Sequence, residues 1–285
     1  MAADQPHVAP PSTPAAAAVV DWDALRRRMP ELREEYVQAK PWSHVVIEGV
    51  FPEELLDTAV DELRNLDRGG MDEAHTSHMV KRETADERLL GPATLQALAL
   101  LNGPEMVEVV SGITGIDGLT ADDDRQWGGV HETPPGGFTK VHCDFVTHPR
   151  SGLFHRSNVL LYLNHEWEEE WGGALELWPP DMRAVGRRIQ PRANTLVIFE
   201  THAGTLHGLP EPVATPDGRS RFSLAAYQYS ATPQPRGRRL AKYAARPEDS
   251  WRIGMPTWWD IKDRIPRPVR NAASAVRRTV QRVAR

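Results

Sequence analysis

Between about residues 125 and 230 the chain consists of short apolar runs separated by glycine, proline, aspartate and asparagine. Runs of this kind occupy residues 159–163, 174–178, 195–199 and 222–229. Short strands at regular spacing, with turn residues between them, are typical of a β-sandwich, jelly roll or barrel. We therefore expect an all-β core over residues 125–230.

The N-terminal part of the chain has a different texture. Residues 1–20 contain a proline cluster and an alanine run without a periodic apolar face, which predicts a disordered leader. Over residues 21–124 we expect support built mainly from helices. One helix is expected to start at Asp21 and break at Pro30, a second to cover 31–40, and others to follow Phe51 and to span 95–110. Residues 44–49 read as a strand and residues 67–83 as a loop.

Charge is distributed unevenly along the chain. Residues 236–285 hold 14 Lys and Arg against 4 Asp and Glu, a net charge of +10. Because the whole chain has a net charge of −5, residues 1–235 carry −15. The C-terminal extension, residues 231–285, is therefore basic, and from Arg267 it reads as a basic helix whose apolar face holds only Val and Ala. We expect this helix either to dock on the acidic remainder of the chain or to be disordered, and we prefer both interpretations to membrane binding. No nucleic-acid partner is expected.

Cysteine content and hydropathy indicate the cellular compartment in which such a chain is expected. Cys143 is the single cysteine, so the chain has no internal disulfide, which is compatible with a reducing cytoplasm. No apolar run approaches the ~20 residues of a membrane-spanning helix, and the N-terminus does not resemble a secretory signal. We expect a cytoplasmic protein without a transmembrane segment.

The segment 136–145 carries the strongest chemical signal. In a strand, alternate side chains point to the same face, so His142 and Asp144 project together. An imidazole and a carboxylate on one face are two thirds of the two-histidine, one-carboxylate set that holds non-haem Fe(II). The third ligand should be a histidine on a later strand, where His207 and His202 are the two candidates.

Five motifs then follow in an order that resembles a known family. They are Gly136-Gly137 before His142-x-Asp144, Leu-Tyr-Leu-Asn-x-x-Trp at 161–167, Trp-Gly-Gly-x-Leu-Glu-Leu at 171–177, His207 followed by Pro210 and Pro212, and Arg-Phe-Ser-Leu from Arg221. This arrangement is similar to the 2-oxoglutarate/Fe(II) dioxygenases of the prolyl-4-hydroxylase-like branch. The resemblance implies an α+β fold: a double-stranded β-helix core (jelly roll, cupin-like) with N-terminal helices and the basic C-terminal helix around it.

The resemblance also implies the cofactors and their ligands. His142, Asp144 and His207 would hold Fe(II), with 2-oxoglutarate and O2 as cosubstrates and ascorbate as a candidate reductant. Arg221 would bind the far carboxylate of 2-oxoglutarate, because a guanidinium pairs with a carboxylate through two parallel hydrogen bonds. The turn at 215–218 lengthens the approach to this strand, so Arg219 is the alternative.

Tyr162 would donate a hydrogen bond to the same carboxylate, with ordinary core packing as the equal alternative. Asn158 and Asn164 share its face and could also line the pocket. The family often carries a tyrosine some nine residues before the first ligand. Thr133 stands there in this chain, which leaves His131 or Gln126 as candidates for that role.

The remaining histidines and the cysteine receive structural interpretations. His148, His155 and His165 are expected in solvated loops, and Cys143 in the core, facing away from the ligands. Segments 67–90 and 147–157 are expected to form the mouth of the pocket.

The predicted function is oxidative decarboxylation of 2-oxoglutarate to succinate, coupled to hydroxylation or a related C–H oxidation of a small molecule such as an amino acid, a sugar or a natural-product intermediate. The alternatives are a prolyl or peptidyl hydroxylase that acts on protein, a non-catalytic ligand-binding jelly roll, and a cupin-type metal-dependent hydrolase or isomerase.

Overall fold

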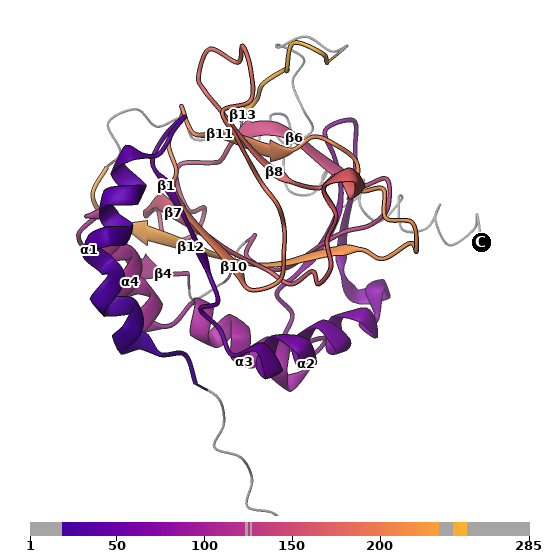
Figure 1. Ribbon diagram of the computed structural model, residues 1–285, viewed down its shortest axis with the longest axis horizontal. Coiled ribbons are helices and arrows are strands. Elements are labelled where there is room, and N and C mark those ends of the chain that lie inside the picture. The colour runs from indigo at the N-terminus through magenta and orange to yellow at the C-terminus, as the bar shows by residue number, and fades with distance from the viewer. Residues whose placement is uncertain (1–18, 123–124, 126, 234–241, 250–285) are drawn as a thin grey trace, which may run out of the picture.

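The computed structural model describes residues 19–122, 125, 127–233 and 242–249, and the predicted leader and basic C-terminal helix lie almost entirely outside them. The described residues form a curled, wholly antiparallel sheet with helices packed against one side (Figure 1). Its thirteen strands are β1 (His44–Glu48), β2 (Asp72–His75), β3 (Met79–Thr84), β4 (Thr120–Ala121), β5 (Gly129–Thr133), β6 (Phe138–Cys143), β7 (Phe154–Tyr162), β8 (Leu175–Trp178), β9 (Arg187–Ile189), β10 (Thr195–Glu200), β11 (Leu206–Leu209), β12 (Arg221–Ser230) and β13 (Lys242–Tyr243).

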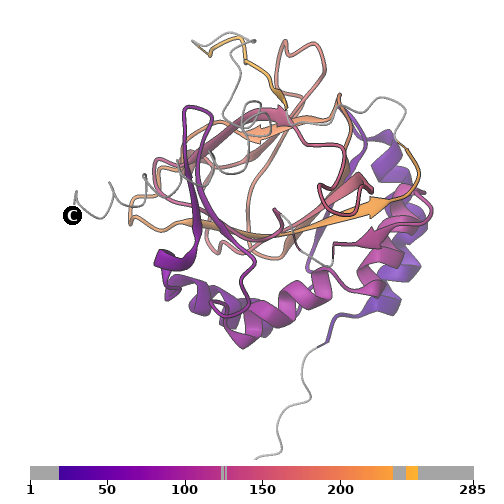
Figure 2. The same cartoon turned by 180° about the vertical axis from the view of Figure 1, so that it is seen from behind.

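The strands follow the order β1-β10-β7-β12-β5-β3-β6-β11-β8-β9, with β2 on β3, β4 on β12 and β13 on β6. Most neighbours in this path are far apart in sequence, as in β1, which pairs His44 with Phe199 of β10. The sheet bends round so that β3 joins β5 to β6. The view from behind shows the same curled sheet (Figure 2). This curled antiparallel arrangement is the jelly roll, or double-stranded β-helix, that the sequence predicts.

Alternation along the strands separates two cores. Leu161 of β7 and Ile198 of β10 point to the helices, whereas Tyr162 and Phe199, one residue further on, point into the curl. Successive side chains of a strand project to opposite faces, so one apolar run supplies both surfaces. The inward face is where a site can form.

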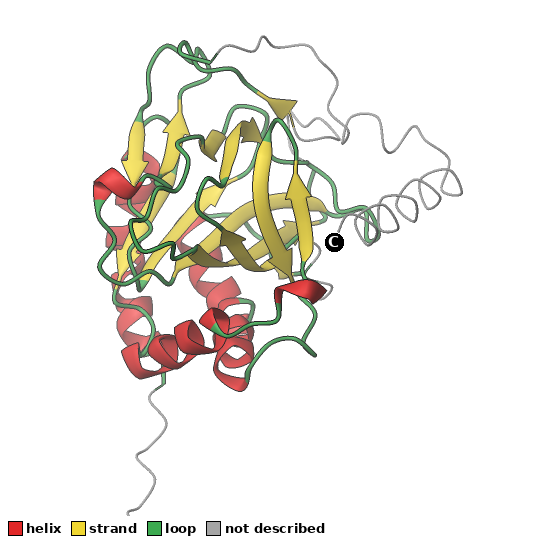
Figure 3. Cartoon of the chain, turned by 90° about the vertical axis from the view of Figure 1, so that its right-hand side faces the viewer, coloured by secondary structure: helices red, strands yellow, loops and turns green. Residues whose placement is uncertain are grey.

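Four α-helices cover the outward face (Figure 3). They are α1 (Trp22–Gln38), α2 (Glu53–Arg64), α3 (Pro92–Leu101) and α4 (Pro104–Thr114), and the 3-10 turns η1 (Arg68–Gly70) and η2 (Glu169–Trp171) accompany them. The Asp21 carboxylate caps α1 by accepting a hydrogen bond from the backbone N–H of Ala24 at 2.8 Å. None of the helices in the described part of the chain is long and apolar enough to cross a membrane.

Three expectations about the N-terminal part are wrong. The helix expected over 95–110 is two helices, because α3 ends at Leu101 and α4 begins at Pro104. Pro30 does not end a helix, since α1 runs through it with the proline ring exposed while Leu25, Leu32 and Tyr36 are buried on the same helix. Burial of that apolar face stabilises the helix beyond what the missing proline donor costs. Residues 67–83 are not a plain loop, because they contain η1, β2 and most of β3.

Candidate active site

A cavity of about 980 Å³ occupies the inside of the curled sheet. Side chains from β3, β5, β6, β7, β8, β11 and β12 line it, so it is the barrel interior. The two segments expected at the mouth both contribute to its lining, through Ala74 to Glu83 on one side and Thr147 to Phe154 on the other.

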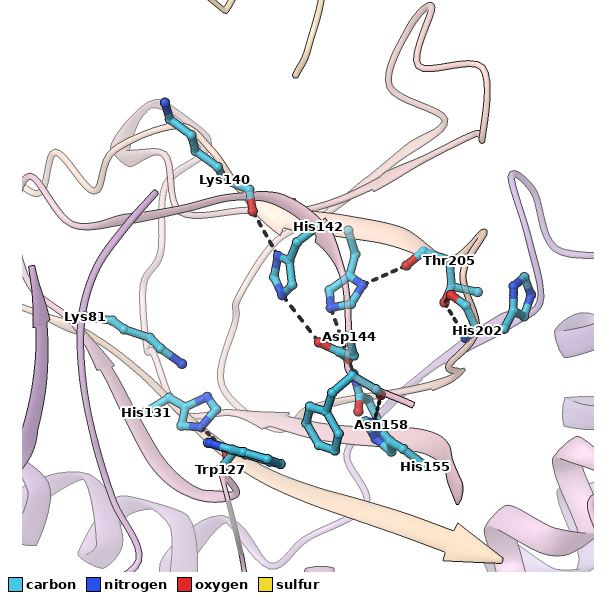
Figure 4. Close-up of polar contacts among 12 residues, drawn as sticks. Lys81, Trp127, His131, Lys140, His142, Asp144, His155, Asn158, His202 and Thr205 are labelled. Atoms are coloured by element: carbon cyan, nitrogen blue, oxygen red, sulfur yellow. Dashed lines mark hydrogen bonds and ion pairs between the residues drawn. The ribbon is translucent and has the colours of Figure 1, made fainter. Parts of the chain in front are cut away.

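His142, Asp144 and His207 come together on one wall of this cavity. Figure 4 shows His142 beside Asp144. His142 of β6 lies opposite His207 of β11 in the sheet register, and Asp144 directly follows β6. One ligand atom from each side chain lies within 4.8 Å of the other two. The Nε2 atoms of His142 and His207 lie 3.4 and 3.6 Å from the Asp144 carboxylate oxygens. The structure therefore brings together all three residues that the sequence predicts as ligands.

Backbone carbonyls fix how the two imidazoles face the carboxylate. His142 Nδ1 lies 2.9 Å from the Lys140 carbonyl, and His207 Nδ1 lies 3.0 Å from the Thr205 carbonyl. A carbonyl only accepts a hydrogen bond, so each Nδ1 carries the proton and each Nε2 presents a lone pair toward Asp144. This orientation by a hydrogen bond on the far ring nitrogen is what metal-ligating histidines commonly show. The donor set fits Fe(II).

The protonation states of His207 and Asp144 at neutral pH favour metal binding at this wall. Burial lowers the pKa of His207 to about 4, even though the nearby Asp144 opposes the shift. Burial acts to raise the pKa of Asp144, but the adjacent His207 and His142 hold it well below its usual range. At neutral pH the site thus offers an uncharged His207 and an ionised Asp144, the forms in which both bind a metal ion.

Asn158 of β7 holds the carboxylate in place. Its Nδ2 donates a hydrogen bond of 2.7 Å to Asp144 Oδ2, and its side chain is almost fully buried. The sequence placed Asn158 on the pocket wall, but the contact with Asp144 comes from the three-dimensional arrangement of β6 and β7. Asn164, expected beside it, instead bonds to the Pro191 and Phe222 carbonyls and has a structural role.

A buried cation lies on another part of the cavity wall. Arg221, the first residue of β12, is 3% exposed, and its Nε donates to the Gly173 carbonyl at 2.8 Å. Its guanidinium carbon lies 4.8 Å from the centre of the Tyr162 ring. Among the described residues no carboxylate pairs with Arg221, and the buried Tyr162 hydroxyl has no hydrogen-bond partner. A buried cation beside an unsatisfied hydroxyl fits the carboxylate of a ligand.

The alternatives for these roles lie elsewhere. Arg219 pairs with Asp217, lies over the Trp171 ring at 5.1 Å and lines a second, smaller cavity on the outside of β12. His202 lies before β11, where its Nε2 is 3.4 Å from Glu200, and it does not join the histidine–aspartate cluster.

Strand β3 adds charged side chains that the sequence did not point to. Lys81 and Glu83 line the cavity and form an ion pair, with Nζ 2.5 Å from Oε2. His131 of β5 lies opposite Glu83 in the register, and its Nε2 is 2.9 Å from the Trp127 carbonyl. Burial lowers the pKa of His131 to about 4, and the positive charge of Lys81 adds to the shift, so this imidazole is neutral at pH 7. Thr133 also lines the cavity, whereas Gln126 lies outside the described residues.

Two of the three histidines expected in solvated loops are buried. His148 lies 3.5 Å from the Asp122 carboxylate, and His155 belongs to β7, where it stacks on Phe145 with ring centroids 4.8 Å apart. Strand β7 begins at Phe154, before the apolar run that marks it in the sequence, which explains the error at His155. His165 is exposed as expected, and Cys143 is buried in the core.

Comparisons with known proteins agree with this geometry. Residues 128–229 match the family model described as the 2OG-Fe(II) oxygenase superfamily. The fold is similar to a prolyl-4-hydroxylase from Pseudomonas putida, at 20% identity and a TM-score of 0.52 over 71% of this chain and 98% of that one. It is also similar to prolyl 4-hydroxylases from Phytophthora capsici, at 19% identity and a TM-score of 0.51 over 78% of this chain and 69% of that one.

A third similar structure is a prolyl hydroxylase from Trichoplax adhaerens in complex with a hypoxia inducible factor oxygen degradation domain peptide fragment. It is 16% identical, with a TM-score of 0.52 over 73% of this chain and 91% of that one. No curated protein matches the chain. The family match spans the strands that carry the histidine–aspartate cluster and the buried arginine, and the jelly roll is the fold of the similar hydroxylases. Residues 128–229 therefore match the 2OG-Fe(II) oxygenase superfamily, whose members are dioxygenases that use Fe(II), 2-oxoglutarate and O2.

Proposed function

We propose that His142, Asp144 and His207 bind Fe(II), that Arg221 and Tyr162 bind the distal carboxylate of 2-oxoglutarate, and that the enzyme hydroxylates a small molecule. The observation that carries this proposal is one cavity that holds both three side chains able to bind a metal ion and a buried arginine that pairs with no carboxylate of the described residues. A non-catalytic jelly roll has no need of either feature.

The iron and 2-oxoglutarate, when bound, supply the oxidation: O2 is consumed, 2-oxoglutarate becomes succinate and CO2, and one oxygen atom enters the substrate. The protein's own residues position these groups. Arg221 offers its two terminal nitrogens to a carboxylate, since its Nε already donates to Gly173. Asn158 keeps the Asp144 carboxylate turned toward the two imidazoles. The lining of the cavity is largely apolar, which strengthens electrostatic contacts made inside it.

A small-molecule substrate is supported by the size of this cavity. Its volume of about 980 Å³ lies within the upper range of small-molecule sites and accommodates 2-oxoglutarate together with a second small ligand. The alternative, a hydroxylase of peptidyl proline, corresponds to the activity that the names of the similar hydroxylases state. We also propose that the protein works in the cytoplasm, in line with its one buried cysteine.

The first test is uncoupled turnover, the conversion of 2-oxoglutarate to succinate without a substrate, by anaerobically purified protein reconstituted with Fe(II). We expect O2-dependent succinate formation that His142→Ala abolishes together with Fe(II) binding. Arg221→Ala should weaken 2-oxoglutarate binding by about 30-fold or more, as expected when one partner of a buried charge pair is truncated. Metal and 2-oxoglutarate binding are followed by calorimetry.

Matched controls come from the two alternatives that lie outside the site. His202→Ala should retain Fe(II) binding, and Arg219→Ala should retain the wild-type affinity for 2-oxoglutarate. If wild-type protein binds neither Fe(II) nor 2-oxoglutarate, the proposal fails and the ligand-binding jelly roll replaces it. Stimulation of succinate formation by a proline-containing peptide, but by no small molecule, would favour the peptidyl hydroxylase.

A further inference from the structure

Apart from histidines, four charged side chains of the described residues line the large cavity: Lys81, Glu83, Asp144 and Arg221. The proposed function uses Asp144 and Arg221 and leaves Lys81 and Glu83 without a role. These two residues alternate along β3, so they point to the same face of the strand, and their side chains are 20% and 22% exposed. A half-buried pair of opposite charges inside a ligand cavity costs desolvation free energy, because both charges lose part of their hydration.

The surroundings of the pair make it the main charged feature of its wall. Figure 4 shows Lys81 grouped with His131 and Trp127, apart from the cluster of His142 and Asp144. His131 is neutral at pH 7 and its Nε2 is engaged by the Trp127 carbonyl, so it adds no charge there. A ligand that enters this part of the cavity therefore meets one ammonium group and one carboxylate.

An aromatic surface connects the pair with the metal-ligand cluster. The rings of Trp127 and Phe145 lie 4.2 Å apart between centroids, and both line the cavity. Phe145 directly follows Asp144, and Tyr227 meets it edge-on at 6.2 Å. An apolar group resting on these rings would lie beside Asp144 while a charged end reached β3.

On the basis of the proposed function, we propose that Lys81 and Glu83 recognise the substrate and that this substrate is a zwitterion of the amino-acid type. Its carboxylate would pair with the Lys81 ammonium and its ammonium with the Glu83 carboxylate, while its apolar side chain rests on Trp127 and Phe145. A ligand with a single charge would take one member of the pair and leave the other desolvated and poorly compensated. A residue inside a peptide carries neither terminal charge, so the pair favours a free amino acid over a protein substrate.

The test is a panel of the free L-amino acids, supplied to the Fe(II)- and 2-oxoglutarate-loaded enzyme and compared with their N-acetyl and C-amide derivatives. Succinate formed above the uncoupled rate and the gain of one oxygen atom by the amino acid are measured together. We expect at least one amino acid with an apolar side chain to respond and both of its derivatives to fail. Derivatives that respond as well as the parent amino acid would overturn the inference.

Variants on β3 test the residues themselves. Lys81→Met and Glu83→Gln should each raise the KM for the responding amino acid at least tenfold. The same loss of affinity should appear in anaerobic calorimetry with Mn(II) and 2-oxoglutarate, where no turnover occurs. Glu73→Gln on β2 is the matched control, because this side chain is 52% exposed and does not line the cavity.

A charge-swapped variant guards against loss of folding. Lys81→Glu combined with Glu83→Lys keeps an ion pair on the strand but exchanges its ends, so it should fold and still lose tenfold or more in amino-acid affinity. Wild-type kinetics in all three β3 variants would overturn the inference. Uncoupled turnover in the wild type with no response to any amino acid would overturn this inference alone, whereas absence of Fe(II) binding would overturn the proposed function as well.

Discussion

At the scale of single residues, the geometry of the triad depends on groups that are not themselves ligands. The carbonyls of Lys140 and Thr205 orient the two imidazoles, and Asn158 orients Asp144. Two of these three contacts are made by the backbone, which no side-chain pattern in a sequence reveals. The proximity of His142 and Asp144 was predictable, because alternation along a strand turns both side chains to the same face.

Asn158→Ala removes the hydrogen bond to Asp144 Oδ2 and leaves that carboxylate free to rotate away from the imidazoles. Loss of such a supporting contact typically lowers metal affinity 10- to 100-fold, and we expect a decrease in that range. Calorimetric titration of Fe(II) under anaerobic conditions gives the dissociation constant. Asn65→Ala, on an exposed asparagine after α2, should leave it unchanged. An unaltered affinity in Asn158→Ala would mean that the contact does not support the metal site.

At the scale of elements, the hairpin formed by β2 and β3 is the part of the fold that the sequence did not predict. Strand β3 lies between β5 and β6, and its inward side chains Met79, Lys81 and Glu83 face a ligand cavity. A strand that faces such a cavity need not show the apolar–polar alternation by which β7, β10 and β12 were recognised. The same limit applies to α1, where a local rule about Pro30 was overruled by packing against α4 that only the fold provides.

A buried carboxylate fastens this hairpin to the barrel. Glu132 of β5 is 1% exposed, accepts a hydrogen bond of 3.0 Å from Arg68 Nε and one of 2.6 Å from Ser220, and lies 3.5 Å from Arg82 Nη1 on β3. Breaking a buried ion pair typically costs 3–5 kcal/mol. Because Arg68 and Arg82 are 34% and 26% exposed, water compensates part of their lost interaction.

We therefore expect Glu132→Ala to lower the free energy of unfolding by about 2 kcal/mol, at the lower side of that range. Urea denaturation followed by circular dichroism measures the change. Glu73→Gln, which removes the exposed carboxylate 3.7 Å from Arg82, should stay within about 0.5 kcal/mol of wild type. Equal effects of the two substitutions would show that Glu132 does not anchor β3.

At the scale of the whole molecule, stability and site chemistry are linked through buried histidines. Burial lowers the pKa of both His131 and His207 to about 4, from the value near 6.5 that they have in an unfolded chain. Between these values the unfolded chain binds more protons than the folded one, so stability is full above pH 6.5 and is lost as the pH falls toward 4. Metal-free protein should accordingly lose stability on mild acidification.

His131→Gln tests how much one histidine outside the proposed metal site contributes to the pH dependence of the free energy of unfolding. Over the roughly 1.5 pH units from 6.5 to 5, one such group contributes about 2 kcal/mol, at 1.36 kcal/mol per unit. The metal-free wild type should thus lose about 2 kcal/mol more than His131→Gln when the pH is lowered from 7 to 5. Urea denaturation at the two pH values measures both losses. Parallel losses in the two proteins would show that His131 is not held neutral by the fold.

The pairing of β1 with β10 has a consequence for how the protein is made. His44 emerges early from a ribosome, yet its partner Phe199 comes late, and the barrel closes only when β11 and β12 follow. Contacts of such large sequence separation slow folding, because a long loop must be ordered before they form. His207 and Arg221 lie on those last strands. A nascent chain that stops before them exposes unpaired strand edges and lacks His207, so the proposed metal site is complete only after nearly the whole barrel has been synthesised.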